Sequence, residues 1–191
     1  MRKHAEHPSW DRLYEIASAQ DGYFSLEQAA DAGYSSQLLH TYLREARVTR
    51  ALRAVYRLVH FPPTENEDLT MLWVWSKHEG VFSHQTALAL HLLSDVLPAE
   101  VHMTLPRDWR RRRTPKGVVV HLDAVPEVDQ TWHGAVRLTS VRRTLNDCAD
   151  ESLAPDLLRQ AALQALSRGL VTRPELGHVD KALQPYGGLT A

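Results

Sequence analysis

The spacing of apolar residues in the N-terminal part of the chain predicts helices joined by short polar turns. Apolar side chains recur at helical spacing after Ser9, after Ser25 and after Ser35, and serine is a preferred residue at helix N-termini. Gln28 follows Ser25 at the spacing of a capping box, and Gly33 suits the end of that helix. The pattern therefore predicts a helix, a short second helix, and a third helix that follows a tight turn.

The third expected helix has one apolar face and one polar face. Leu39 and Tyr42 fall on the apolar side when the segment is drawn at helical periodicity. The opposite side carries donors and acceptors suited to base edges and phosphates, namely Ser36, Gln37, His40, Thr41, Arg44 and Arg47. An ordinary amphipathic surface helix has a similar pattern, so this helix alone does not decide between the two interpretations.

The segment after this helix alternates in a way that predicts a β-hairpin. Two β runs between Val48 and Val59 flank the pair Arg53-Ala54, and the segment also carries Arg50 and Arg57. A helix-turn-helix followed by a basic hairpin is the pattern of a winged helix, in which the hairpin lies along the phosphates. All three arginines are therefore predicted to contact DNA.

Charge is segregated along the chain although the formal net charge is only -1. Residues 36–60 contain five arginines and one acid, Glu45, whereas residues 61–106 contain six acids and one basic residue, Lys77. A neutral total thus conceals a basic N-terminal region, which favours binding to a polyanion.

Two prolines divide the sequence into two expected domains. Pro62 and Pro63 precede Thr64 and Glu67, which have the spacing of a capping box. The boundary is placed near Pro62, giving a winged helix-turn-helix domain at 1–62 and a larger mixed domain at 63–191. The segments EVHMTLP, GVVVHL and GAVRLTS are expected strands, and helices are expected at the C-terminus, so the fold class is α+β.

The composition is that of an ordinary globular protein, with 43% hydrophobic and 24% charged residues. The lone Cys148 excludes an internal disulfide and is interpreted as a small buried hydrophobe. The basic start of the chain is not followed by the apolar run of a secretory signal, and no apolar run reaches the roughly 20 residues of a membrane span. We expect a cytoplasmic protein with no membrane partner.

Three segments resemble successive signatures of the AbiEi family, the DNA-binding antitoxins of type IV toxin-antitoxin systems. They read LHTYLREARVTRALRAVYRL, VFSHQTALALHLLSDVLPAEVHMTLP and VRLTSVRRTLNDCAD. The resemblance implies a repressor of its own operon whose C-terminal domain counteracts a nucleotidyltransferase-type toxin encoded beside it.

The sequence departs from the family pattern in two places. The family usually has glycine before the Val-Tyr of the wing, whereas this chain has Ala54, for which a positive φ costs about 1 kcal/mol. The resemblance also fades after Asp150, so the segment from Leu153 onward is assigned by its helical pattern.

The residues needed for phosphoryl-transfer or nuclease chemistry are not assembled in the sequence. A nucleotidyltransferase would need a Gly-Ser turn before paired aspartates, and the chain has no Gly-Ser dipeptide. A nuclease would need carboxylates and a lysine together, and Asp123, Glu127 and Asp129 have Lys116 as the nearest lysine. We expect no enzymatic activity, no catalytic residues and no cofactor.

The eleven histidines do not form a recognisable metal motif. His84 and His91, or His4 and His7, lack a cysteine or carboxylate at site spacing, so no metal is expected. Ser83 is interpreted as a helix cap. Its neighbour His84 is not expected to act as its base, because adjacent helical side chains point in different directions.

The densest run of charge is PRDWRRRRTPKG at 106–117. Three interpretations stay open for it, a solvated loop, a second phosphate contact, or a docking site for an acidic partner. The residues concerned are Arg110, Arg111, Arg112, Arg113 and Lys116, with Trp109 either stacking or packing inward.

The sequence therefore favours a DNA-binding antitoxin that represses its own promoter at inverted repeats and opposes a toxin with or without direct contact. The alternative is a stand-alone winged-helix regulator with an α+β dimerisation or ligand domain. A third hypothesis is a protein-interaction module that binds no DNA.

Overall fold

The computed structural model describes residues 7–189 and has a mixed α+β architecture. Residues 1–6 and 190–191, which include the basic start and His4, lie outside the described part. The chain separates into two compact units. The first comprises residues 1–79 and 134–136, and the second comprises residues 80–133 and 137–191.

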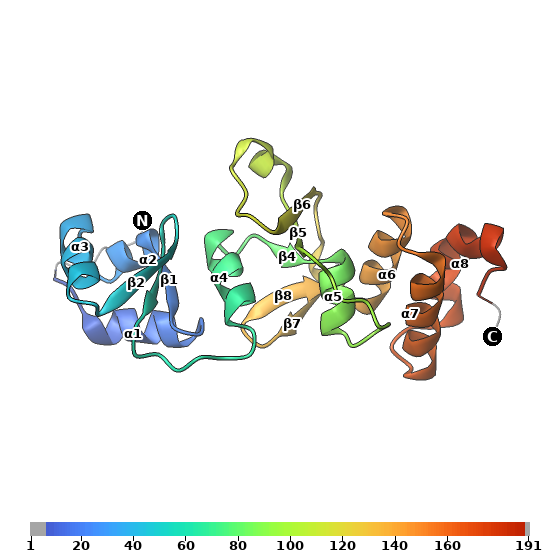
Figure 1. The fold of residues 1–191 in the computed structure, drawn as a ribbon, viewed down its shortest axis with the longest axis horizontal. Coiled ribbons are helices and arrows are strands. Elements are labelled where there is room, and N and C mark those ends of the chain that lie inside the picture. The colour runs from blue at the N-terminus through green and yellow to red at the C-terminus, as the bar shows by residue number, and fades with distance from the viewer. Residues whose placement is uncertain (1–6, 190–191) are drawn as a thin grey trace. The chain divides into compact units, whose positions relative to one another are not determined.

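The first unit contains helices and a small antiparallel sheet (Figure 1). Its elements in chain order are α1 (Trp10–Ser18), β1 (Tyr23–Ser25), α2 (Leu26–Asp31), α3 (Ser36–Arg44), β2 (Val48–Leu52), β3 (Val55–Leu58) and α4 (Glu67–Trp75). Within residues 7–79 the strands form one sheet in the order β1-β3-β2. The three expected helices and the hairpin are therefore present, and β1 was not predicted.

The expected serine caps are confirmed in this unit. The Ser9 hydroxyl accepts a hydrogen bond from the Arg12 amide, and Ser35 caps α3 in the same way. Ser25 and Gln28 form the predicted capping box at the start of α2. Each cap satisfies amides that have no partner inside the helix, which stabilises a helix by about 1 kcal/mol.

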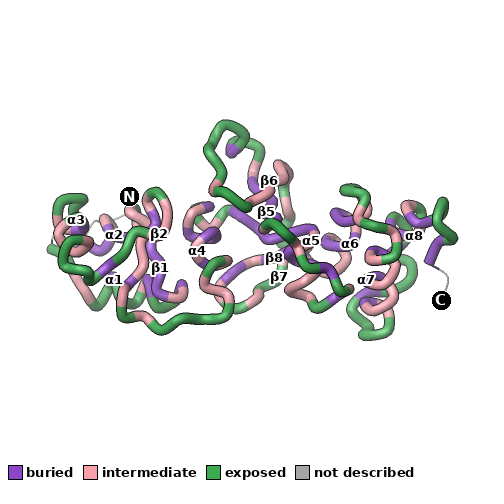
Figure 2. Tube along the Cα trace, in the orientation of Figure 1, coloured by how far each residue is buried: buried purple, intermediate pink, exposed green. Residues whose placement is uncertain are grey.

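Apolar side chains from the helices and the sheet form the core of this unit. Leu13, Phe24, Leu39, Val48 and Leu58 are all at most 3% exposed and belong to one packed cluster. Figure 2 shows these inward-facing segments as buried, whereas stretches of α3 are exposed. The amphipathic pattern read from the sequence thus sets which helix faces meet the sheet.

The first compact unit extends beyond the expected boundary near Pro62. Helix α4 lies after Pro62, yet its Val74 is 1% exposed and packs with Tyr23 and Val55. The first unit consequently extends to Glu79. Two prolines mark a turn in the chain, but they do not show with which unit the next helix packs.

The expected capping box at the start of α4 is wrong. The helix begins at Glu67 after Asn66, which makes no side-chain capping bond. The Glu67 carboxylate instead accepts a hydrogen bond from Arg57 at 2.7 Å. An arginine partner competes successfully with the backbone amide that the capping pattern assigned to this glutamate.

The second unit combines a mixed sheet with a helical region (Figure 1). Its strands are β4 (Val81–Phe82), β5 (Val101–Leu105), β6 (Val118–Leu122), β7 (Gln130–His133) and β8 (Val136–Thr139). In the described residues their order is β6-β5-β4-β8-β7, with β5 antiparallel to β4 and parallel to β6. Strands β5, β6 and β8 match the sequence prediction, whereas β4 and β7 were missed.

The second unit also contains four α-helices among its described residues. They are α5 (His84–Leu90), α6 (Val141–Asp150), α7 (Pro155–Ser167) and α8 (Gly177–Leu183), and short 3-10 turns lie at Arg107–Arg111, Glu127–Asp129, Arg173–Leu176 and Gln184–Tyr186. Their buried faces share an apolar cluster that includes Leu88, Leu145 and Leu158. Cys148 is 1% exposed within this cluster, and burial raises the pKa of its thiol to about 12. Its interpretation as a small buried hydrophobe is confirmed.

Across residues 7–189, the helices are too short or too polar to cross a lipid bilayer.

Candidate functional site

The polar face of α3 is exposed as the sequence predicted. Ser36, Gln37, His40 and Arg44 are solvent-exposed, whereas Leu39 on the opposite face is 1% exposed. The exposed side chains provide a hydroxyl, an amide, an imidazole and a guanidinium along one helix surface. These are the group types that hydrogen-bond base edges and phosphates.

Two other residues of the predicted face are already engaged within the protein. Thr41 is half-buried, and its hydroxyl donates to the Gln37 carbonyl at 3.3 Å. The Arg47 guanidinium lies 4.7 Å from the ring of Trp10 and 4.1 Å from that of Tyr42. Cation-π contact fixes this exposed arginine beside the C-terminal end of α3.

The hairpin separates its arginines into two classes. Arg50 and Arg53 are exposed on β2 and at the turn that follows. Arg57 on β3 differs from expectation, because its guanidinium donates to the Glu67 carboxylate at 2.7 Å and to the Pro62 carbonyl at 3.3 Å. Its charge is thus neutralised within the protein, and we remove it from the predicted phosphate contacts.

The hairpin turn keeps the geometry that glycine would favour. Ala54 has φ +62°, and its carbonyl accepts a hydrogen bond from the amide of Leu26 at 2.9 Å. Ala54 thus adopts the left-handed backbone at the position where the AbiEi pattern has glycine. The turn is held against the start of α2 despite the cost of a left-handed alanine.

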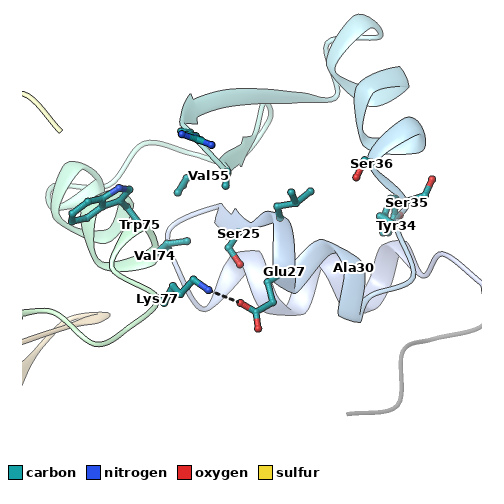
Figure 3. Close-up of a pocket in the computed structure, with 13 residues that line it drawn as sticks. Ser25, Glu27, Ala30, Tyr34, Ser35, Ser36, Val55, Val74, Trp75 and Lys77 are labelled. Carbon is teal, nitrogen blue, oxygen red and sulfur yellow. Dashed lines mark hydrogen bonds and ion pairs between the residues drawn. The ribbon is translucent and has the colours of Figure 1, made fainter. Parts of the chain in front are cut away.

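A cavity of about 670 Å³ lies between the start of α3, the hairpin turn and α4. Figure 3 shows the side chains around it, including Ser36, Trp75 and Lys77. Lys77 pairs with Glu27 at 3.4 Å at its edge. Ser36 and Arg53 both line the cavity, so two residues expected to contact DNA from different elements border the same hollow.

The basic run in the second unit forms an exposed turn. Trp109 packs inward with 5% exposure, and the Arg112 guanidinium lies 3.9 Å from its ring centre. Arg112 also lies 3.8 Å from the Asp108 carboxylate. The exposed basic side chains of this turn include Arg110, Arg111, Arg113 and Lys116.

The carboxylates considered for a nuclease are not gathered at one point. Asp123 pairs with Arg143 at 2.8 Å, and this hydrogen bond holds the pKa of Asp123 below its usual value. Asp129 pairs with Arg142, and Glu127 is exposed. Asp123 and Asp129 are therefore each bound to a different arginine, and Glu127 is exposed.

A histidine cluster that the sequence did not predict lies in the second unit. His84 begins α5, His102 lies on β5 and His121 lies on β6. One nitrogen from each ring lies within 4.8 Å of the others, and this is a set that can hold a metal ion among the described residues. Glu151, the residue directly after α6, provides a carboxylate beside two of the rings.

The contacts within this histidine cluster are close. Nδ1 of His102 lies 3.1 Å from Nε2 of His121. The other nitrogen of His121, Nδ1, lies 3.1 Å from Oε1 of Glu151. The rings of His84 and His121 stack with centres 3.5 Å apart and an interplanar angle of 17°. His84 and His102 are 7% and 9% exposed, so most of the cluster is removed from water.

Ser83 and His84 contact one another, contrary to the sequence expectation. The Ser83 hydroxyl lies 2.9 Å from Nδ1 of His84, accepts a hydrogen bond from Thr104 at 2.8 Å, and makes no capping bond. The expectation assumed two helical neighbours, but Ser83 has extended backbone and His84 has φ +52°. A positive φ in a histidine costs about 1 kcal/mol and is unusual outside functional or strongly constrained positions.

Burial disfavours the charged form of two rings of this cluster, His84 and His121. Desolvation, with added repulsion from His121, His102 and Arg143, lowers the pKa of His84 to about 3. Desolvation also lowers the pKa of His121, although Glu151 opposes the shift. Neutral imidazole is the form that binds metal ions.

Sequence reasoning missed this cluster because it depends on strand register. In the parallel pair β5/β6, His102 lies opposite Val119 and His121 lies opposite Thr104. The two histidines are therefore diagonal neighbours on one face of the sheet. One histidine in each of two predicted strands was a usable signal. Local sequence does not determine, however, how strands separated by a long loop pair with one another.

The chain matches no protein-family model and no curated protein. It is similar to the crystal structure of the RV2827C protein from Mycobacterium tuberculosis, at 14% identity and a TM-score of 0.45, over 98% of this chain and 80% of that one.

Proposed function

We propose that the first unit is a winged helix that binds double-stranded DNA, and that the chain is a type IV antitoxin. In this proposal it represses its own operon and neutralises a nucleotidyltransferase-type toxin encoded beside it. The DNA-binding part is supported by the geometry of the first unit. The antitoxin part is supported by the AbiEi-like sequence segments.

The order of elements supports the winged helix. Helix, strand, helix, helix and hairpin follow one another, and β1 pairs with β3 rather than with β2. This order places α3 directly before the hairpin, which is the arrangement in which a recognition helix enters the major groove beside a wing.

The observation that carries the proposal is the exposed polar surface of α3 together with the hairpin arginines. Gln37, His40 and Arg44 face solvent on the helix, and Arg50 and Arg53 face solvent on the hairpin. A guanidinium on an exposed strand attracts phosphate, and the helix side chains are long enough to reach base edges.

These surfaces have different roles in the proposal. Gln37, His40 and Arg44 read bases, whereas Arg50 and Arg53 grip phosphates. Arg44→Ala should therefore reduce discrimination between operator and random DNA by about 1–3 kcal/mol, and Arg53→Ala should weaken binding to both about equally.

A titration of the full chain on its own upstream DNA and on random DNA tests this part. Wild type should prefer the upstream DNA, and the two arginine variants should show the separated effects described above. Lys181→Ala, an exposed basic residue on α8, is the matched control and should bind like wild type. Equal, weak binding of wild type to both DNAs would point instead to a protein-interaction module.

The antitoxin role is tested separately, by colony survival when the neighbouring reading frame is expressed. The proposal expects that frame to encode a nucleotidyltransferase-type toxin and expects survival to require this protein. DNA binding without rescue would leave the stand-alone regulator. A direct contact would be detected by co-purification, with the exposed basic turn at 107–116 as the first surface to alter.

A further inference from the structure

We propose that His84, His102 and His121 bind one divalent transition-metal ion, with zinc as the ion that best suits the set. The site lies wholly in the second unit and is independent of the proposed contacts with DNA. Nitrogen ligands of this kind favour Zn²⁺ and its neighbours over Mg²⁺ or Ca²⁺, which prefer oxygen.

The distance between two of the rings already fits a tetrahedral site. Two nitrogens bound to the same zinc at 2.0–2.1 Å lie about 3.3 Å apart. Nδ1 of His102 and Nε2 of His121 lie 3.1 Å apart. Both atoms can therefore contact a single ion with little movement of β5 and β6.

Glu151 completes the geometry as an orienting group for His121. Its carboxylate lies 3.1 Å from Nδ1, the nitrogen that does not face His102. A proton held on Nδ1 by this carboxylate leaves the lone pair on Nε2. Carboxylate-histidine-metal arrangements of this type fix the tautomer and the ring orientation in metalloproteins.

His84 provides the third ligand from the start of α5. Its Nδ1 contacts the Ser83 hydroxyl, which also accepts from Thr104. When His84 donates from Nδ1 to Ser83, its Nε2 carries the lone pair for a metal. The ring must turn out of its stack on His121 to complete the set.

Charge around the cluster is compatible with a cation. Arg143 is the nearby positive group, and it is paired with Asp147 at 2.7 Å and with Asp123 at 2.8 Å. Glu151 adds a negative charge beside the rings. Three imidazoles also leave one tetrahedral position for water or another ligand, as in open zinc sites.

The test uses the full chain after metal is removed with a chelator. Zn²⁺ affinity and stoichiometry are measured by competition with a chromophoric chelator, and Co²⁺ is used as a spectroscopic probe. We expect one Zn²⁺ per chain, the d–d absorption of tetrahedral Co²⁺, and a melting temperature that rises with Zn²⁺.

Two variants and one control make the result specific. The double variant His102→Gln/His121→Gln should lose the Co²⁺ absorption and the thermal shift. Glu151→Gln should keep the fold by circular dichroism and weaken Zn²⁺ binding by about 10- to 100-fold. His60→Gln, at an exposed histidine of the first unit, should bind like wild type.

Two results would overturn the site. In one, wild type shows no stoichiometric Zn²⁺ binding, and the cluster is then a metal-free stack of neutral rings. In the other, stoichiometric binding survives in both the double variant and Glu151→Gln, and the ligands then lie elsewhere in the chain. Neither result bears on operator binding, which is measured separately.

Discussion

Arg57 on β3 and Glu67 at the start of α4 form an ion pair with Nη2 and Oε2 2.7 Å apart. The side chains are 18% and 33% exposed, so the pair is partly removed from water. It joins the hairpin to a helix that follows two prolines. The pair therefore makes α4 part of the first unit and removes one arginine from the surface available to DNA.

Replacing this arginine should affect stability more than DNA binding. Arg57→Ala leaves the half-buried Glu67 without its partner, so the free energy of unfolding should fall by about 1–2 kcal/mol, between the values for exposed and buried pairs. Urea unfolding measures the change. The exposed Arg50→Ala should change stability by less than about 0.5 kcal/mol and should weaken DNA binding instead. A reversed pattern would return Arg57 to the DNA-contacting set.

The extent of the first unit gives a second prediction. A fragment of residues 1–62 lacks Val74, which is buried beside Tyr23 and Val55, whereas a fragment of residues 1–79 retains it. The longer fragment should unfold cooperatively and at higher urea. Within the full chain, Val74→Ala should destabilise by about 1–3 kcal/mol through lost burial and the cavity left behind. Equal urea midpoints for the two fragments would favour a boundary near Pro62.

Local signals predicted the parts of the fold that depend on neighbouring residues. Ser25 with Gln28 marked the start of α2, and the alternation around Arg53 marked the hairpin. Strands β1 and β4 were missed because they have only three and two residues, too short for a periodic pattern. The partner of Glu67 was also missed, since a capping pattern cannot report a competing arginine from another element.

The candidate sites follow the same division. The exposed face of α3 was predicted because helical periodicity alone determines it. The contacts of Arg47 with Trp10 required knowledge of how α1 and α3 pack. The meeting of His102 with His121 required the β5/β6 register. The exposed surface of α3 could therefore be predicted from the sequence, whereas the histidine cluster could be found only from the tertiary structure.

The hairpin turn carries backbone strain that a single substitution should relieve. Ala54 has φ +62°, where glycine has no steric penalty. Ala54→Gly should raise the free energy of unfolding by up to about 1 kcal/mol. Ala30→Gly in α2 is the matched control and should lower it by roughly 0.5–1 kcal/mol, because a helix interior gains nothing from the added freedom. Thermal unfolding of both variants distinguishes these opposite signs.

Operator binding should depend steeply on salt. Arg44 at the end of α3, Arg47 in the turn before β2, and Arg50 and Arg53 on the hairpin are all exposed. If about four phosphates are neutralised, affinity should fall roughly 10²-fold between about 50 and 200 mM salt, because bound counterions are released. Fluorescence anisotropy across this range gives the slope of log affinity against log salt concentration. Arg53→Ala should make this slope shallower by about one. A flat response in wild type would contradict the assignment of this surface to DNA.

Acid should destabilise the metal-free second unit through the buried His84. Burial lowers the folded-state pKa of His84 to about 3, whereas an unfolded histidine has a pKa of about 6.5. The unfolded chain therefore binds more protons between these values, so stability is at its plateau above about pH 6.5 and falls as the pH is lowered toward 3. Urea unfolding with chelator present should show this loss between about pH 7 and 5.

The same measurement on His84→Asn separates this histidine from other titrating groups. Asparagine tolerates the positive φ at this position and does not titrate. The stability of the His84→Asn variant should therefore depend less on pH than that of wild type. His60→Asn, at an exposed position, should retain the wild-type dependence. An unchanged pH dependence in His84→Asn would mean that the acid sensitivity arises elsewhere, because removing a buried neutral imidazole must remove its share of the proton uptake on unfolding.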